Sequence, residues 1–250
     1  MANDNNEYLG TSIALIKFFT KEEHYLAFKN GSSLFRPPHF FRTNDDPGRG
    51  DRTESCLGYW DKTLGDQFPI FLDPEGKPLD LPYDLEAAEK ILIHPTNEVH
   101  DSWIQCWTYI ESHNCFEDSL EKMLDEFGPY FVILPIHNIK AYAELLSTIS
   151  KSSVSGCLVD YSDDPLKRSL TVKDSCFSHQ KEYRFFVGQC SKEEISEKFL
   201  SLPGLGDLLL KDANTLKVTA PSGGIRYCTQ GRKEVITVEA DSSLSERHSN

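Results

Sequence analysis

The opening part of the chain alternates between β-forming runs and one short helical pattern. Residues 11–20 are rich in β-branched and aromatic side chains, which predicts a strand. Residues 21–31 carry acidic side chains first, basic ones later and a final glycine, which predicts a short helix. Thr20 has the character of an N-cap for this helix, with Glu23 three residues on at the capping-box position.

Two prolines interrupt the next β-forming stretch. Residues 32–43 predict a second strand, and Pro37 and Pro38 require it to lie at a sheet edge or to break into an extended loop. The segment that follows, 42–56, is dense in charged residues and has no apolar period. It therefore predicts a loop.

The rest of the chain continues this mixture of patterns. Helical patterns occur over 84–93, 115–128, 138–150 and 191–202. Strand patterns occur over 102–111, 129–136, 156–162, from about Glu182 to 188, 216–221 and 234–240. The mixture has no internal repeat and no evident interdomain linker, so it predicts an α+β fold. We expect a single domain over 11–240 with a central mixed or antiparallel sheet and flanking helices, between disordered ends at 1–10 and 241–250.

Length and composition are those of an ordinary globular protein. At 250 residues with 39% hydrophobic residues, the chain can bury a core without covalent cross-links. No apolar run approaches the ~18 residues that span a bilayer, and the polar N-terminus lacks the pattern of a secretory signal. We therefore expect no membrane partner, and a protein that is cytoplasmic or is delivered into a host cytosol without a Sec-type signal.

Cysteine spacing and net charge narrow the chemistry. The seven cysteines include no C-x-x-C pair, which favours free thiols in a reducing compartment over a disulfide framework or a structural zinc site. The net charge of −13, from 26 basic and 39 acidic side chains, disfavours binding to nucleic acid. A local basic cleft that binds nucleic acid stays open as an alternative.

The sequence QKEYRFF contains a candidate site. In a strand, alternation places Glu182 and Arg184 on one face with Gln180 beside them, while Tyr183 and Phe185 face the other way. The guanidinium of Arg184 would hold the Glu182 carboxylate in its ionised form. A solvated strand face, or a structural ion pair that contributes little stability, is the competing interpretation.

Arginine and aromatic residues gather just before the charged loop. Arg36 and Arg42 lie among Phe35, Phe40 and Phe41. Arginine binds phosphate through paired hydrogen bonds and aromatic rings stack on bases, so this composition is typical of a nucleotide site. An ordinary surface loop is also charged. The chain has no Walker A, dinucleotide-binding, H-E-x-x-H or G-x-S-x-G motif.

Phe177, Gln180 and Glu182 have the spacing F-x-x-Q-x-E. This resembles the ADP-ribosyltransferase-like toxins and effectors, which carry a Q/E-x-E signature where a loop enters a strand. The same region is similar to an uncharacterised bacterial and phage family with a K-x-x-x-F-x-x-E-x-E-Y-R signature, which Lys173 and the residues up to Arg184 match loosely. Some members of that family lie near toxin or defence genes. The first predicted strand of this chain offers Lys17 where the transferases commonly carry arginine or histidine.

The resemblance to the transferases implies a substrate and a set of site residues. NAD would be the substrate, and no metal would be needed. Glu182 would stabilise the oxocarbenium-like ribose and bind its 2′-hydroxyl, and Gln180 would help to orient the acceptor. The diphosphate would bind Arg36 or Arg42. The other candidates are Thr108 at the Ser/Thr position of a neighbouring strand, Tyr109 and Arg184 for cofactor binding, and Asp51 and Glu54 as possible loop contacts.

The expected function is mono-ADP-ribosyl transfer from NAD to a protein or nucleic-acid acceptor by a toxin, effector or defence protein. Two other classes stay open. A non-catalytic interaction or inhibitor protein would use the acidic surface as a charge mimic. A metal-dependent nuclease would combine Asp160 with Gln180 and Glu182, although Arg184 stands where the lysine of such a core belongs.

Overall fold

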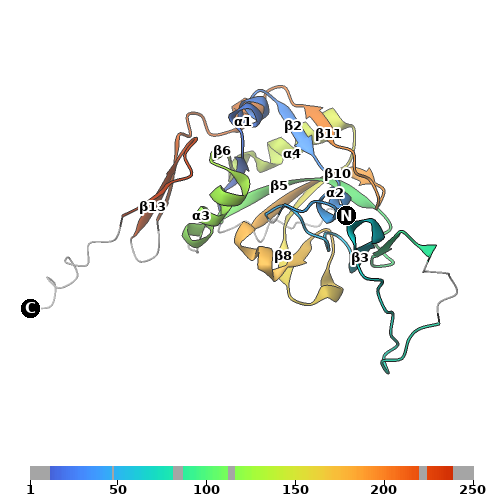
Figure 1. The fold of residues 1–250 in the computed structure, drawn as a ribbon. Coiled ribbons are helices and arrows are strands. Elements are labelled where there is room, and N and C mark those ends of the chain that lie inside the picture. Colours follow the sequence, from blue (N-terminus) through green and yellow to red (C-terminus); the bar gives the residue numbers. More distant parts are fainter. Residues whose placement is uncertain (1–11, 47, 81–86, 112–115, 220–223, 239–250) are drawn as a thin grey trace, which may run out of the picture.

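The computed structural model describes residues 12–46, 48–80, 87–111, 116–219 and 224–238. An antiparallel sheet of five strands, in the spatial order β6-β1-β5-β10-β7, runs through the centre (Figure 1). The fold is α+β with an antiparallel central sheet, as the sequence predicts. The five strands are β1 (Ser12–Phe19), β5 (Asp101–Glu111), β6 (Tyr130–Pro135), β7 (Val154–Leu158) and β10 (Glu182–Cys190).

Four smaller sheets of the described residues lie around the central one. The pairs β2–β11 and β3–β4 are antiparallel, β8–β9 is parallel, and β12, β13 and β14 form an antiparallel meander. These strands are β2 (Ser32–Phe35), β3 (Gly58–Asp61), β4 (Lys90–Ile93), β8 (Asp160–Ser162), β9 (Val172–Asp174), β11 (Lys198–Ser201), β12 (Thr215–Thr219), β13 (Ile225–Thr229) and β14 (Val235–Val238).

Helices cover both faces of the central sheet because neighbouring residues of its strands point to opposite sides. Trp107 and Phe185 face α4, whereas Ile16 and Phe131 face α3 and the β12–β13 hairpin. The α-helices are α1 (Glu22–Lys29), α2 (Pro38–Arg42), α3 (Phe116–Phe127), α4 (Ile139–Ser150) and α5 (Leu205–Leu208). The 3₁₀ helices are η2 (Lys62–Leu64), η4 (Ile136–Asn138), η5 (Pro165–Lys167) and η6 (Ser175–Gln180).

Two segments predicted as helices contain strands instead. Residues 198–201 of the predicted helix 191–202 form β11, which pairs with β2. Residues 90–93 of the predicted helix 84–93 form β4, which pairs with β3; residues 84–86 lie outside the described part of the chain. In both cases pairing with a distant strand outweighs the local helical preference.

The first helical region also differs from its prediction. α1 begins at Glu22 with Lys21 at the N-cap, and no side chain caps it, so Thr20 is not the N-cap. The second strand ends at Phe35, and Pro38–Arg42, which we expected to be extended, form the short helix α2. Proline is favoured at the first helical position because the backbone there needs no hydrogen-bond donor. Pro38 therefore starts this helix rather than simply breaking the strand.

The central sheet opens between β1 and β5. The ladder that joins these strands ends at the pair Ile16–Thr108. Beyond this pair, β1 continues to Phe19 beside β6, whereas residues 101–107 of β5 lie beside β10 and bridge to Arg36. The two strands thus diverge, and this divergence positions the site described below.

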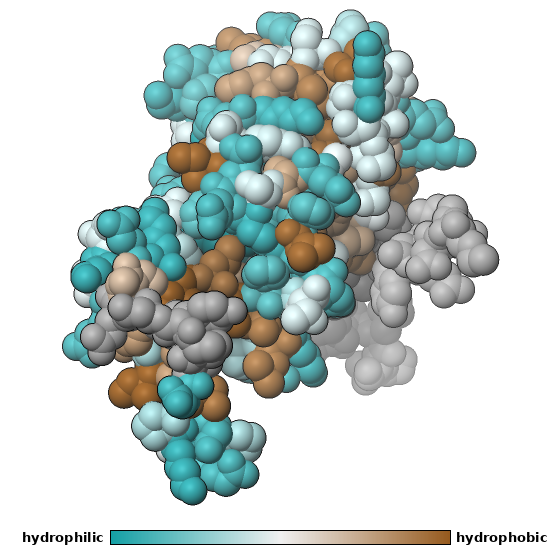
Figure 2. Space-filling model, turned by 90° about the vertical axis from the view of Figure 1, so that its right-hand side faces the viewer, coloured by the Kyte–Doolittle hydropathy of each residue, from teal (hydrophilic) through white to brown (hydrophobic). Residues whose placement is uncertain are grey.

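The outer surface mixes polar and apolar side chains. On the face seen in Figure 2, polar residues (teal) predominate and apolar residues (brown) gather toward the lower end. The segment 62–80 contributes several exposed apolar side chains, among them Phe68, Ile70, Leu72 and Leu79. Within the described ranges, no helix has both the length and the apolar character needed to cross a membrane.

Candidate functional site

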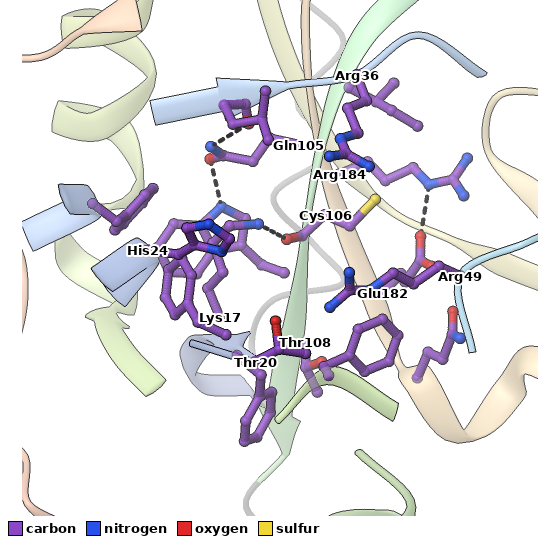
Figure 3. A pocket seen from close by; sticks show the side chains of 18 of the residues that line it. Lys17, Thr20, His24, Arg36, Arg49, Gln105, Cys106, Thr108, Glu182 and Arg184 are labelled. Carbon is purple, nitrogen blue, oxygen red and sulfur yellow. Dashed lines mark hydrogen bonds and ion pairs between the residues drawn. The ribbon is translucent and has the colours of Figure 1, made fainter. Parts of the chain in front are cut away.

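A pocket of about 390 Å³ lies where β1 and β5 diverge (Figure 3). Its wall combines aromatic side chains with several charged ones. The charged and hydroxyl-bearing side chains that matter most for its chemistry are Lys17, Arg36, Arg49, Thr108, Glu182 and Arg184. They come from β1, β5, β10 and the segment after β2, so the fold gathers them from widely separated parts of the sequence.

Glu182 is the first residue of β10, directly after a sharp change of backbone direction. Helix η6 ends at Gln180, and Lys181 adopts a left-handed conformation with φ of 44°. The backbone N–H of Glu182 donates to the hydroxyl of Tyr161 at 2.8 Å. Glu182 is also the cross-strand partner of Thr108 in β5. This turn and the strand pairing fix the position of the carboxylate at the pocket.

The carboxylate of Glu182 is buried between two cations. Its Oε1 accepts from Lys173 Nζ at 2.8 Å and its Oε2 from Arg184 Nε at 2.7 Å. Burial alone would raise the pKa of Glu182, but the charges of Arg184 and Lys173 outweigh burial and lower it to about 2. Glu182 is therefore ionised at neutral pH, as the sequence predicts.

Arg184 connects Glu182 to the charged loop. Its guanidinium is fully buried and donates to both carboxylate oxygens of Glu54, at 2.6 and 2.7 Å. It also donates to the carbonyl oxygen of Leu170 at 2.8 Å. Burial disfavours the charged guanidinium, yet Glu182 and Glu54 together raise the pKa of Arg184 further above its ordinary value. Arg184 thus acts as a fixed bridge between two carboxylates.

The two carboxylates bound to Arg184 differ in their environment. The pKa of Glu54 is raised, first because of burial and also because of nearby Asp51, although Arg184 opposes the shift. Glu182 has a second close cation in Lys173 at 2.8 Å, whereas Lys173 lies 4.0 Å from Glu54. Of the two, Glu182 is the carboxylate held more firmly in its ionised form.

Gln180 lines the pocket but is engaged by the protein. Its side-chain oxygen accepts from Lys173 Nζ at 3.0 Å, and its amide nitrogen donates to the carbonyl oxygen of Gly48 at 2.9 Å. Lys173 lies in β9 and contacts Glu182 as well. Gln180 therefore ties the loop at Gly48 to the residues that hold Glu182.

Three basic side chains at the pocket differ in how far the protein neutralises them. Arg36 pairs with Glu197 at 2.6 Å and stacks on the ring of Phe40, with its guanidinium carbon 3.8 Å from the ring centroid. Arg49 and Lys17 form no ion pair with another residue in the described ranges. Arg49 therefore has more capacity for an anionic ligand than Arg36, which already shares its charge with Glu197.

The structure brings together most of the predicted site residues, but not all. Glu182, Gln180, Arg36, Thr108, Arg184 and Glu54 line the pocket. Arg42 does not. It is buried elsewhere, where it donates to Asp101 at 2.8 Å and to the carbonyl oxygens of Glu54, Ser55 and Lys192.

Asp51 and Tyr109 also lie outside the pocket wall. Asp51 is buried, and one of its carboxylate oxygens accepts from the backbone N–H and the hydroxyl of Thr53, both at 2.9 Å. It shapes the loop that carries Glu54. Tyr109 follows Thr108 in β5, so its side chain points to the opposite face, where Lys181 Nζ lies 5.9 Å from the ring centroid.

Sequence reasoning left Lys173, Arg49 and Lys17 out of the candidate list. Lys173 belongs to the K-x-x-x-F spacing, and Phe177 does lie beneath its amine, 4.4 Å from the ring centroid. Arg49 is one of several charged loop residues, and local pattern gives no sign of which one faces a pocket. Lys17 stands in a strand of apolar residues, and this isolated charge was the available signal.

Comparisons with known proteins leave the site to be interpreted from its geometry. The chain matches no protein-family model, and searches of curated proteins and of solved structures also gave no match. In the described part of the chain, no group of three or more histidine, cysteine or acidic side chains is arranged to hold a metal ion. The six cysteines of that part are free thiols.

Proposed function

We propose that the pocket binds NAD and that the protein cleaves the bond between nicotinamide and ribose, transferring ADP-ribose to an acceptor. The observation that carries the proposal is the position of Glu182. It is an ionised carboxylate at the wall of a pocket whose other walls supply Thr108, Arg36 and Arg49. In this proposal Glu182 acts on the ribose, Thr108 binds the ribose or the nicotinamide, and the two arginines bind the diphosphate.

Glu182 would act on the charge that develops during bond cleavage. When the bond to nicotinamide breaks, its electron pair leaves with the nicotinamide nitrogen, and positive charge develops on the ribose. A fixed carboxylate stabilises that charge without reorganising during the reaction. Each oxygen of Glu182 accepts one hydrogen bond from the protein, and a carboxylate oxygen can accept two. Each oxygen thus keeps one acceptor position, and either position is available for a ribose hydroxyl.

The remaining pocket residues would position the substrate. Arg49 has no ion-pair partner among the described residues, and the Arg36 guanidinium is only partly neutralised at its pair with Glu197. Both suit a diphosphate, which arginine binds through paired hydrogen bonds. The Thr108 hydroxyl lies on the same face as Glu182 and suits the ribose or the amide of nicotinamide. Holding reactants in this way is itself a large part of catalysis.

The proposal is tested with Glu182→Gln, which keeps the shape of the side chain and removes its charge. Wild-type protein should be stabilised against heat by NAD and should release nicotinamide, with transfer to an acceptor or to water. Glu182→Gln should reduce nicotinamide release about 10²–10³-fold, because it removes a charge that is needed in the transition state. Nicotinamide release is measured by chromatography, with and without a cell extract as the source of acceptors.

Asp61→Asn is the matched control. Asp61 is also a buried carboxylate, but it lies outside the pocket and binds Thr63 and Tyr59. Its loss should lower the melting temperature without lowering nicotinamide release per folded molecule. Two results contradict the proposal: full activity in Glu182→Gln, or wild-type protein that neither binds NAD nor releases nicotinamide. The second result, together with capture of a protein partner by the acidic surface, would favour the interaction-protein alternative.

A further inference from the structure

Lys17 occupies the gap between the two diverging strands. It follows Ile16, the last residue of β1 that pairs with β5, and its amine donates to the carbonyl oxygen of Cys106 across the gap at 2.9 Å (Figure 3). The amine lies 6.0 Å from the ring centroids of both Phe19 and Trp107. Lys17 thus stands in an aromatic part of the pocket wall, held by a neutral carbonyl group.

The pocket contains a second lysine, which shows what is distinctive about Lys17. Lys173 is buried, whereas Lys17 is half-buried, and the Lys173 amine pairs with Glu182 at 2.8 Å. Burial opposes a rise in the pKa of Lys173, yet the nearby Glu182 and Glu54 raise it. Lys17 has no carboxylate partner in the described ranges, and burial lowers its pKa to about 8, helped by Arg49. A neutral amine is a nucleophile and an ammonium ion is not, so Lys17 is the lysine suited to react.

We propose that Lys17 forms a reversible imine with the aldehyde group of a phosphorylated sugar bound in this pocket. The ligand class rests on the proposed function: when water is the acceptor, the product is ADP-ribose, whose ribose ring opens to an aldehyde. Arg49 holds the phosphate end, and the rings of Phe19 and Trp107, each with its centroid 6.0 Å from the amine, form an apolar wall beside it. The imine keeps the product at the site and slows its release.

The chemistry balances without an oxidant or a reductant. The lysine nitrogen attacks the aldehyde carbon, and the carbonyl oxygen leaves as water with the two hydrogens of the amine. One carbon–nitrogen double bond forms and one carbon–oxygen double bond breaks. Addition of water reverses the step. A ligand that displaces water from this aromatic wall favours the imine, because water is a product of its formation.

The experiment traps the imine with cyanoborohydride, which reduces it to a stable secondary amine. Wild-type protein is incubated with ADP-ribose and the reductant, and the modified peptide is identified by mass spectrometry. Lys17 should be modified at least about tenfold more than the exposed Lys21 or the buried Lys173, since a pKa near 8 leaves far more neutral amine at about pH 7.5 than an ordinary lysine has. ADP, which has no aldehyde, should compete and form no adduct.

Lys17→Arg provides the matched control, because arginine keeps the positive charge and forms no imine under these conditions. This variant should lose the adduct while retaining heat stabilisation by ADP, which also reports that it is folded. Modification spread over exposed lysines, or equal modification of Lys17 and Lys173, overturns the inference. The adduct assay needs no NAD cleavage. A Lys17 adduct in a protein without NAD turnover therefore keeps this inference and rejects the proposed function, and turnover without an adduct does the reverse.

Discussion

Two clusters of buried charged residues use the same chemistry in different places. The pocket cluster consists of Glu54, Lys173, Glu182 and Arg184 and lines the cavity. The core cluster consists of Arg42, Ser55, Asp101 and Lys192 and does not reach it. Each places an arginine and a lysine around carboxylates that are almost fully excluded from water.

The core cluster is closed by its own hydrogen bonds. Asp101 accepts from Arg42 at 2.8 Å, from Lys192 at 2.9 Å and from the hydroxyl of Ser55 at 2.7 Å. Arg42 also donates hydrogen bonds to backbone carbonyl oxygens, including that of Glu54 at 2.6 Å. A buried charge cluster with every group satisfied contributes to a unique structure rather than to chemistry.

Glu54 links the two clusters. Its backbone carbonyl group accepts from Arg42 in the core cluster, and its side chain binds Arg184 in the pocket cluster. The core cluster thus anchors the loop that completes the pocket. Arg42 therefore serves the site indirectly, because it fixes the backbone of a residue that lines the pocket.

Replacing Arg42 of the core cluster and Arg36 of the pocket wall should separate the structural role from the binding role most clearly. Arg42→Met removes a charge that Asp101 needs, and breaking a buried pair in this way typically costs 3–5 kcal/mol, so we expect the free energy of unfolding to fall by about that amount. Arg36→Met is the matched control, since Arg36 is partly exposed and pairs with the exposed Glu197. It should cost less than about 1 kcal/mol of stability.

Arg36→Met, the variant with the smaller loss of stability, should show the larger loss of NAD binding. This loss should exceed that of Arg42→Met in its folded fraction, because Arg42 acts on the pocket only indirectly, through the backbone of Glu54. Urea unfolding and calorimetric titration give the two quantities. Equal stability losses in the two variants would remove the structural distinction between Arg42 and Arg36, and a loss of NAD binding in folded Arg42→Met as large as that in Arg36→Met would return Arg42 to the binding site.

The next largest effect is expected from acid. The pKa of Glu182 is lowered to about 2 in the folded protein, so its contribution to stability is present above its unfolded pKa and is lost as pH falls toward 2. The shift corresponds to about 3 kcal/mol as an order of magnitude. The stability difference between wild type and Glu182→Gln, measured by urea unfolding, should therefore narrow from about pH 5 to about pH 2.5. A difference that stays constant would mean that Glu182 is not held ionised by Arg184 and Lys173.

The part of the site that lies within β10 could be predicted from the sequence. Alternation predicts Glu182 and Arg184 on one face and Tyr183 and Phe185 on the other, and β10 begins at Glu182 with Tyr183 and Phe185 in the core. A period of two residues is a property of the strand itself, so no knowledge of the rest of the fold is needed.

The site residues that lie outside β10 could not be predicted from the local sequence pattern. Arg36 and Arg42 look equivalent in the sequence, but the helix started by Pro38 carries Arg42 into the core and leaves Arg36 at the pocket. Lys173 reaches Glu182 because β9 pairs in parallel with β8, a contact that no periodicity announces. The same limit explains why residues 198–201 were predicted as part of a helix. They form β11 only because they pair with β2, and that contact cannot be seen in the local sequence.

The smallest predicted effect concerns Glu197, the partner of Arg36. Glu197→Gln should change stability by less than about 1 kcal/mol, because the pair is partly exposed to solvent. It should strengthen the binding of ADP about two- to fivefold, because it frees the Arg36 guanidinium and removes a negative charge from the pocket wall. Asp207→Asn, which removes the same charge from an exposed pair with Lys211, should leave ADP binding unchanged.

Because a screened surface charge acts over about 10 Å at 0.1 M salt, the gain from Glu197→Gln should shrink as salt is added. Equal gains in both variants would point to net charge rather than to Arg36 as the cause.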